Sequence, residues 1–483
     1  MAALLLPILS TQAQPKNFIY QLGLTRANST ARGCSTYNGI NLEASGLMTA
    51  KQGFCGSFLL IVSVLLSACR WQELPPIKVG ILHSLTGTMA ISEKSVVDAT
   101  LMAIEEVNAA GGVLGRRLQA VVVDGKSDWP SFATGARQLI QDDNVKVIFG
   151  CWTSASRKEV KVVVEALDHL LFYPVQYEGL EASANIIYTG STPNQQIFPA
   201  VKWSVENFGK RVFLAASDYV FPRAANKLIK KQLQALGAQV VGEAYVLLGS
   251  DRLNAMTDAI AKSNADVILN TINGDSNITF FNQLAAKKNK IPVMSFSLAE
   301  GELQHLDVKT VTGHYAAWSY FQSLNSKANI KFVRSIKKKY GEHRTTNASM
   351  EAGYIGVHLW AKAANQSKSV EPTTVKTTLR GQVFNAPEGR VIISASNNHL
   401  WKPFYIGKIQ DDGQFEIVWR DKQLLKPQPF PMYESKDYWR YYLNNLYLNW
   451  QGNWAPLGHY VPVTKLQYAK NAWSKSNNSG ALH

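Results

Sequence analysis

The sequence predicts an α/β protein with two doubly wound, Rossmann-like lobes joined by three crossovers. From residue 77 onward, short and almost wholly apolar segments alternate with segments of helical periodicity. This alternation is typical of parallel strands that are covered by helices on both faces. The alternation restarts near residue 195, after a first block that ends near residue 188. Two such blocks predict two lobes.

The first block opens with an apolar strand at Ile77–His83 and a Ser-Leu-Thr-Gly loop. Apolar residues at helical spacing then predict a helix over residues 96–108, which Gly111 and Gly112 would end. A later helix is expected to begin near Ser156, because Ser156 and Glu159 have the spacing of a capping box. The other expected elements are strands at 118–123, 145–150, 171–175 and 186–188 and a helix at 132–141.

The second block repeats this pattern. It is expected to contain helices at 195–208, 223–236, 254–263 and 276–288 and strands at 211–216, 239–245, 266–271 and 291–296. After a strand at 314–318, the pattern predicts helices at 330–340 and 350–364 and antiparallel strands at 390–394, 401–409 and 415–419. The Pro-rich segment 426–431 is expected to end the fold.

The chain leaves the second block for two helices and then returns, so crossovers are expected near residues 193, 316 and 385. One lobe is predicted to consist of residues 77–192 plus 317–384, and the other of residues 193–316 plus 385–435. Residues 436–483 are predicted to be a C-terminal extension with a poorly ordered tail.

The segment before the first block indicates export. An apolar run follows Lys51 and ends in Leu66-Ser67-Ala68-Cys69. A basic residue, a short apolar run and small residues before a cleavage point make an export signal, and the run is shorter than the roughly 20 residues that span a bilayer. Its end resembles the bacterial lipobox, whose Cys is lipidated and becomes the mature N-terminus. A buried core element is the alternative.

Met48 would be a conventional start for this signal. Residues 48–68 are therefore predicted to be a lipoprotein signal peptide, and residues 1–47 a mis-called upstream extension or, alternatively, part of a tandem targeting segment. The mature protein is expected on the periplasmic side, anchored to the membrane by lipid at Cys69.

The composition limits the possible partners. The formal net charge is +15, but the Lys and Arg residues are spread over short runs on expected helices, which are usually solvated faces. No nucleic-acid partner is therefore expected. After processing at Cys69, Cys151 would be the one cysteine left in the folded body, which excludes an intramolecular disulfide and a zinc site built on several cysteines. No metal or cofactor is expected.

The candidate site lies in the loops that follow the strands, because ligands of open parallel sheets bind beyond the carboxyl ends of the strands. These loops are residues 84–87, 151–154, 177–179, 217–222 and 273–277. Any single hydroxyl or acid in them is more often a helix cap than a ligand contact, but the loops taken together favour a binding site. The sequence has no Gly-x-Ser-x-Gly elbow, Walker A loop or His-Glu-x-x-His motif, so no enzyme is expected. Cys151 is the one plausible nucleophile, and a lone Cys after a strand is more often inert.

Four segments in and around these loops resemble a known family. They are residues 150–157 (Gly-Cys-Trp-Thr-Ser-Ala-Ser-Arg), 171–179 (Leu-Phe-Tyr-Pro-Val-Gln-Tyr-Glu-Gly), 193–196 (Pro-Asn-Gln-Gln) and 217–223 (Ser-Asp-Tyr-Val-Phe-Pro-Arg). They resemble the urea-binding proteins of bacterial urea ABC transporters, which are type I periplasmic binding proteins related to the amide sensors of amidase operons. The resemblance runs from about Ile77 to Pro431. It implies a receptor that captures urea or a short-chain amide between two lobes and delivers it to an ABC transporter permease.

The same resemblance implies several site residues. The aromatic-Thr-Ser triplet of the amide-binding branch falls on Trp152, Thr153 and Ser154, and the tyrosine of its Ser-Asp-Tyr motif falls on Tyr219. Amide sensors have a Thr at the position of Val175, so this chain departs from them there, and Gln176 is expected to supply a polar group nearby.

Urea is flat and neutral, with one carbonyl and four N–H groups. Its N–H groups need acceptors, for which Glu178 and Asp275 are candidates, and its carbonyl needs donors such as Ser154 or Thr153. The expected flat walls are Trp152, Tyr173 and Tyr219. Two alternatives stay open from the residues: an amino-acid receptor of the same fold, and an amide hydrolase that uses Cys151.

Overall fold

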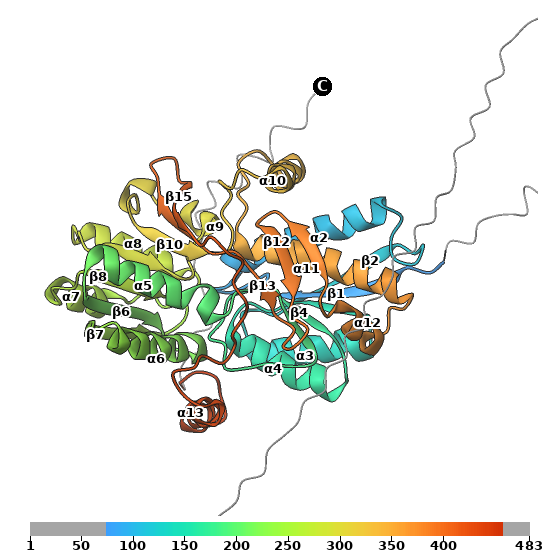
Figure 1. The fold of residues 1–483 in the computed structure, drawn as a ribbon, viewed down its shortest axis with the longest axis horizontal. Coiled ribbons are helices and arrows are strands. Elements are labelled where there is room, and N and C mark those ends of the chain that lie inside the picture. The colour runs from blue at the N-terminus through green and yellow to red at the C-terminus, as the bar shows by residue number, and fades with distance from the viewer. Residues whose placement is uncertain (1–73, 457–483) are drawn as a thin grey trace, which may run out of the picture. The chain divides into compact units, whose positions relative to one another are not determined.

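The computed structural model describes residues 74–456. The predicted upstream extension, the signal peptide, Cys69 and most of the predicted C-terminal tail lie outside these residues. The described part is an α/β structure with two lobes, each built on its own sheet with helices on both faces (Figure 1). The expected fold class is confirmed.

The first sheet has five parallel strands in the order β2-β1-β3-β4-β5. Its strands are β1 (Ile77–His83), β2 (Leu118–Asp124), β3 (Ile148–Gly150), β4 (Leu171–Tyr173) and β5 (Ile186–Tyr188). Strands β1, β3, β4 and β5 are almost entirely buried, as their continuous apolar sequences predict, whereas β2 at one edge is half-buried. One face is covered by α2 (Ala90–Ala109) and α11 (Ala348–Ser367), and the other by α3 (Trp129–Gln141) and α4 (Ser154–Ala166).

The second sheet has seven strands in the order β15-β14-β10-β9-β8-β6-β7. Its strands are β6 (Arg211–Ser217), β7 (Gln239–Val246), β8 (Val267–Thr271), β9 (Val293–Ser295), β10 (Tyr315–Trp318), β14 (Tyr405–Ile409) and β15 (Phe415–Arg420). The last two are antiparallel to their neighbours, as expected. The helices of this lobe are α5 (Ile197–Phe208), α6 (Val220–Ala235), α7 (Asn254–Lys262), α8 (Ser276–Ala286) and α9 (Glu300–Leu303), with 3-10 turns η1 (Pro193–Gln195) and η2 (Val308–Thr310).

A third, small sheet follows α10 (Lys327–Tyr340), α11 and α12 (Pro372–Leu379). It is an antiparallel sheet of β11 (Val383–Ala386), β12 (Gly389–Ile393) and β13 (Leu400–Trp401). His399, next to β13, forms a bridge with Tyr188 at the edge of the first sheet, whereas β14 and β15 join the second sheet. The predicted lobe boundaries stay a prediction.

An expected helix start and an expected capping box were wrong. The helix predicted from residue 96 begins at Ala90, because the polar residues before residue 96 are buried by specific partners: Ser92 donates to Glu302 and Glu93 accepts from the Ser84 N–H. The predicted capping box of Ser156 and Glu159 is also absent from α4. Thr153 is the cap residue of that helix, and its side chain accepts from the Ser156 N–H at 3.0 Å.

The expectation that the Pro-rich segment ends the fold was wrong as well. The chain continues into α13 (Lys436–Asn449), capped by the side chain of Ser435. Trp439 on this helix is fully buried, and the preceding Glu434 forms an ion pair of 2.6 Å with Lys231 of α6. The Pro-rich segment separates β15 from α13, and aromatic residues of α13 such as Trp439 supply an apolar face that packs on the rest of the fold.

Gly179 lies where two segments approach closely. Its φ is +68°, and a Cβ there would lie 2.4 Å from the carbonyl oxygen of Pro429. Gly115 has nearly the same backbone, with φ +71°, but nothing lies within 4 Å of its added Cβ.

We therefore expect Gly179→Ala to destabilise the protein more than Gly115→Ala. Both variants carry the cost of a left-handed alanine, about 1–2 kcal/mol, and only Gly179→Ala adds an overlap worth about 1–3 kcal/mol. Unfolding in guanidinium chloride measures both values. Equal losses of stability would contradict the close approach of the Pro429 segment.

Candidate ligand-binding site

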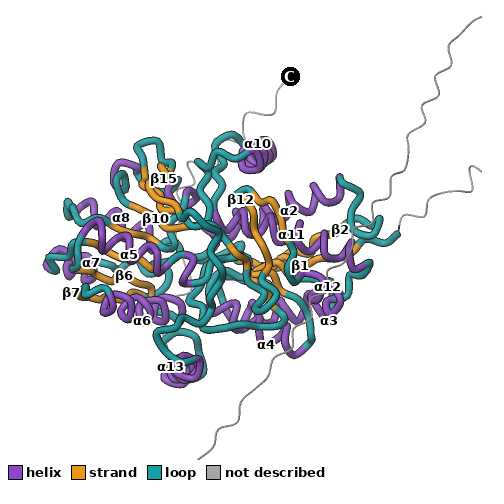
Figure 2. The backbone as a smooth tube through the Cα atoms, in the orientation of Figure 1, coloured by secondary structure: helices purple, strands orange, loops and turns teal. Residues whose placement is uncertain are grey.

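In each sheet there is one point at which the strand order reverses, and loops of the candidate site lie on both sides of that point. In the first sheet the reversal lies between β1 and β3, and in the second between β6 and β8. Ligands of doubly wound sheets bind beyond the carboxyl ends of the strands at such switch points. The loops after these four strands are residues 84–89, 151–153, 218–219 and 272–275. Loops and turns fill the region between the two sheets (Figure 2).

Hydrogen bonds join the two lobes at these loops. The Thr88 hydroxyl, after β1, donates to Asp275, after β8. Gln176, after β4, donates through Nε2 to the Phe296 carbonyl at 2.8 Å and to the Ser297 hydroxyl at 3.0 Å, after β9. The lobes are therefore in contact through strand-end loops, and the predicted residues Gln176 and Asp275 take part in these contacts.

Three predicted polar residues of the first lobe have protein partners. The Thr153 hydroxyl caps α4. The Tyr173 hydroxyl donates to the Trp152 carbonyl at 2.6 Å. The Ser154 hydroxyl donates to Glu178 and accepts from Arg157 at 3.0 Å. Their predicted roles toward a ligand stay predictions, and the structure shows what each group also does for the fold.

Two predicted residues carry buried polar atoms that have no hydrogen-bond partner among residues 74–456. These atoms are Nε1 of Trp152, a donor, and Oε1 of Gln176, an acceptor. Each side chain is 5% exposed. The orientation of the Gln176 amide follows from its Nε2, which faces two oxygen atoms. Unpaired buried polar atoms are costly, so such atoms in a strand-end loop point to a ligand.

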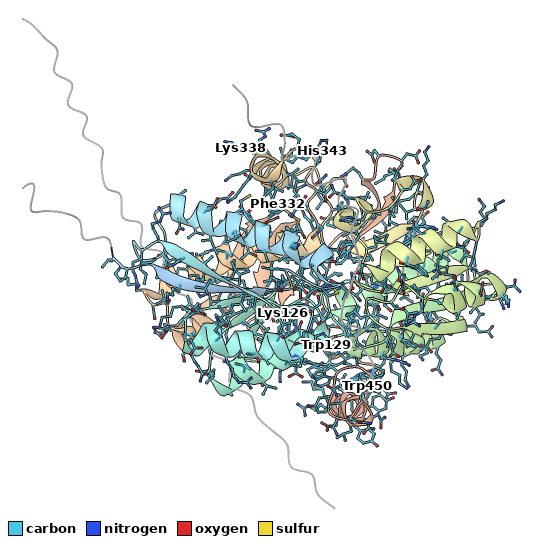
Figure 3. The ribbon with its side chains drawn as sticks, turned by 180° about the vertical axis from the view of Figure 1, so that it is seen from behind. Lys126, Trp129, Phe332, Lys338, His343 and Trp450 are labelled. Atoms are coloured by element: carbon cyan, nitrogen blue, oxygen red, sulfur yellow. The ribbon has the colours of Figure 1, made fainter. Side chains whose placement is uncertain are left out.

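Tyr219 and Asp275 are the two predicted site residues that lie in the second lobe. Tyr219 is buried, and burial raises the pKa of its hydroxyl well above the usual value, so the group stays protonated. Its ring lies 6.3 Å from that of Trp129. Trp129 is the first residue of α3 and is labelled in Figure 3. Burial also raises the pKa of Asp275, against the hydrogen bond from Thr88. Trp129 and Thr88 were not predicted, because they lie outside the quoted motifs.

Cys151 directs the chain from β3 into α4. Its φ of +69° is in the left-handed region, and the turn places Trp152 at the end of the strand. The thiol is fully buried, and burial followed by the nearby Glu93 carboxylate raises its pKa well above the usual value. A nucleophilic cysteine needs a lowered pKa, so this environment disfavours the hydrolase alternative.

A buried ion network underlies the first-lobe side of the site. The guanidinium of Arg157 is 3.1 Å from Glu178 and 3.0 Å from Glu181, and it lies over the rings of Tyr173 and Tyr177. Burial would raise the pKa of Glu181, but the charges of Arg157 and Lys158 outweigh it and lower that pKa. Arg157 is part of a quoted motif, but only the structure shows that it is fully buried.

Two kinds of feature are absent from residues 74–456. Within this range no group of three or more His, Cys, Asp or Glu side chains could hold a metal ion. No helix in the same range has both the length and the apolar character needed to cross a membrane.

Comparison with known proteins places this geometry in a class. The sequence pattern of the periplasmic binding protein domain matches residues 77–436. An ABC transporter solute-binding protein of Rhodopseudomonas palustris, solved with 3,4-dihydroxybenzoic acid, has a TM-score of 0.67 at 20% identity, over 73% of this chain and 98% of that chain. The fold is that of the type I periplasmic binding proteins. The chain belongs to the periplasmic binding protein family.

Two curated relatives show different extents of similarity. Leu/Ile/Val-binding protein homolog 8 of Brucella abortus is 21% identical over 385 residues, which cover 74% of this chain and 94% of that protein. The limonene hydroxylase of Geobacillus stearothermophilus is 35% identical over 121 residues, and these cover 25% of this chain and only 22% of that protein.

Replacing Arg157 should reveal the importance of the ion network. Arg157→Met leaves Glu178 and Glu181 with Lys158 as their remaining cation, and removing one partner of a buried pair costs about 3–5 kcal/mol. Lys161→Met is the control, because Lys161 forms a more exposed pair with Glu165 and such pairs contribute about 0.5 kcal/mol or less. The free energy of unfolding of both variants is measured in guanidinium chloride. Equal losses of that free energy would refute the structural importance of the Arg157 network.

Proposed function

We propose that this protein is an extracytoplasmic solute-binding protein that captures urea or a short-chain amide between its lobes and delivers it to the permease of an ABC transporter. The membership of the family and the fold support the receptor class. The loops at the two switch points support the location of the ligand.

The observation that carries the choice of ligand is the pair of unpaired buried atoms, Trp152 Nε1 and Gln176 Oε1. A ligand that satisfies both must offer an acceptor to the indole and a donor to the amide oxygen. Urea and primary amides carry a carbonyl and N–H groups on adjacent atoms, so one small molecule meets both requirements. Tyr219 would then provide a flat wall, while the ligand lies at the edge of the Trp152 ring, in line with its Nε1–H.

The charges near the site also favour a neutral ligand. Glu178 is compensated by Arg157, and one oxygen of Asp275 accepts from Thr88. A carboxylate ligand would need donors that compensate its charge, and none of the eight predicted ligand-binding residues is basic. The proposed ligand contacts remain Trp152, Thr153, Ser154, Tyr173, Gln176, Glu178, Tyr219 and Asp275.

An amino-acid ligand is the second candidate. The names of the Leu/Ile/Val-binding relatives favour it, and Asp275 could accept from an ammonium group. The two candidates differ in what they need, since an amino acid brings a carboxylate that the site would have to neutralise.

Calorimetric titration with urea, acetamide, leucine and 3,4-dihydroxybenzoate separates the candidates. Trp152→Phe removes one N–H and keeps a flat ring, so urea should bind about five- to tenfold more weakly, the value of one hydrogen bond of about 1 kcal/mol or slightly more. Trp360→Phe is the matched control, because Trp360 also has a buried unpaired Nε1 but lies in α11 against Phe149. Urea affinity that neither substitution changes would exclude Trp152 as a ligand contact.

Binding of leucine but not urea by the parent protein would establish the second candidate, and ammonia release from urea would indicate the hydrolase.

We also propose that the mature chain begins at Cys69, carries lipid there and stays anchored on the periplasmic side. The sequence Leu66-Ser67-Ala68-Cys69 after an apolar run supports this. The intact mass of membrane-extracted protein should correspond to a lipidated chain from Cys69, and Cys69→Ala should leave an unprocessed precursor. An unlipidated N-terminus upstream of residue 69 would refute the anchor.

A further inference from the structure

The segment 431–456, here called the C-terminal strap, contacts both lobes. The match to the family ends at residue 436, so all of α13 after its first residue, and the residues that follow it, lie beyond the matched part. In Figure 1, α13 lies on the side of the molecule where α6 of the second lobe and α4 of the first lobe are found. Contacts between α4 and α6 also join the two lobes there.

Three contacts hold the strap on the second lobe. Glu434 pairs with Lys231 of α6. The Tyr442 hydroxyl donates to the Arg223 carbonyl at 3.1 Å. The Trp454 carbonyl accepts from the Val220 N–H at 2.9 Å.

The last contact meets a specific need of α6. The first N–H groups of a helix have no partner inside the helix and are usually satisfied by the side chain of the cap residue. The cap residue of α6 is Tyr219, which makes no side-chain cap bond. The Trp454 carbonyl therefore satisfies a donor at the start of α6, directly next to a proposed wall of the ligand site.

The side chain of the same residue contacts the first lobe. The Lys158 ammonium lies 4.9 Å from the centre of the Trp454 ring. Glu159 of the same helix and Trp454 line a common surface pocket. The Tyr447 ring of α13 packs on the Trp454 ring at 4.6 Å. Lys158 also pairs with Glu178, which accepts from Ser154. One tryptophan thus contacts α6 with its backbone and α4 with its ring.

We propose that Trp454 is a positioning residue for the ligand site: through the C-terminal strap it holds the start of α6, with Tyr219, against the first-lobe helix that begins at Ser154. The contacts that carry this role are those of Trp454 with Val220, Lys158 and Tyr447. Its effect on ligand binding rests on the function proposed above, whereas its effect on α6 does not.

The test measures hydrogen exchange and urea binding in the full chain. Trp454→Ala should speed exchange of the Val220 amide about tenfold, because local opening exposes the N–H that the strap covers. It should also weaken urea binding about fivefold, mainly through faster dissociation. Tyr441→Ala is the control on α13, since Tyr441 is 67% exposed and should change neither value. Trp454→Phe keeps a ring for Lys158 and Tyr447 and should restore most of the protection.

Each outcome has a defined meaning. Unchanged Val220 exchange in a folded Trp454→Ala protein overturns the proposal. Faster exchange with unchanged urea affinity, in a parent protein that binds urea, overturns the positioning role. A parent that binds no urea refutes the proposed ligand, and the exchange measurement still decides whether the strap holds α6. If Trp454→Ala does not fold, Trp454→Leu is measured by the same two criteria.

Discussion

The rest of the site depends on the burial of Arg157. A guanidinium that is fully out of water must have its charge compensated, and Glu178 and Glu181 supply two carboxylates from one loop. This requirement ties the loop after β4 to the first turn of α4. Ser154 is drawn into the same network, and Tyr173 and Tyr177 pack under the cation. The network therefore gives the first-lobe loops a fixed arrangement before any ligand is bound.

The two lobes meet through polar contacts at the strand ends. The Thr88–Asp275 and Gln176–Ser297 bonds join loops whose parent sheets are separate. Such bonds can be exchanged with water when lobes separate, so they do not commit the protein to one arrangement. A ligand that contacts Trp152 on one side and Tyr219 on the other would add a difference in affinity between the two arrangements, which is what shifts a hinge equilibrium.

Much of the fold follows from the sequence because strands buried on both faces leave a plain apolar signal, as in Ile77–His83. Strand ends then indicate Trp152, Tyr219 and Asp275 as candidates. Apolar periodicity fails to predict structure where polar residues are buried by distant partners. The polar residues Ser92 and Glu93 made the first turn of α2 look exposed, so it was not predicted, and nothing in the sequence indicates that Arg157 is fully buried. Trp129 and Trp454 were missed because their roles depend on contacts with residues far along the chain.

The late position of α11 has a consequence for the order in which the chain folds. The first sheet is complete at Tyr188, yet one of its faces is covered partly by α11, which ends at Ser367. An emerging chain thus exposes apolar surface of the first lobe until most of the second lobe has been synthesised. Contacts of such large sequence separation slow folding. Slow folding keeps such a chain unfolded for longer, which suits a protein that must cross a membrane before it folds. The apolar surface that stays exposed meanwhile is one that a holding chaperone can bind.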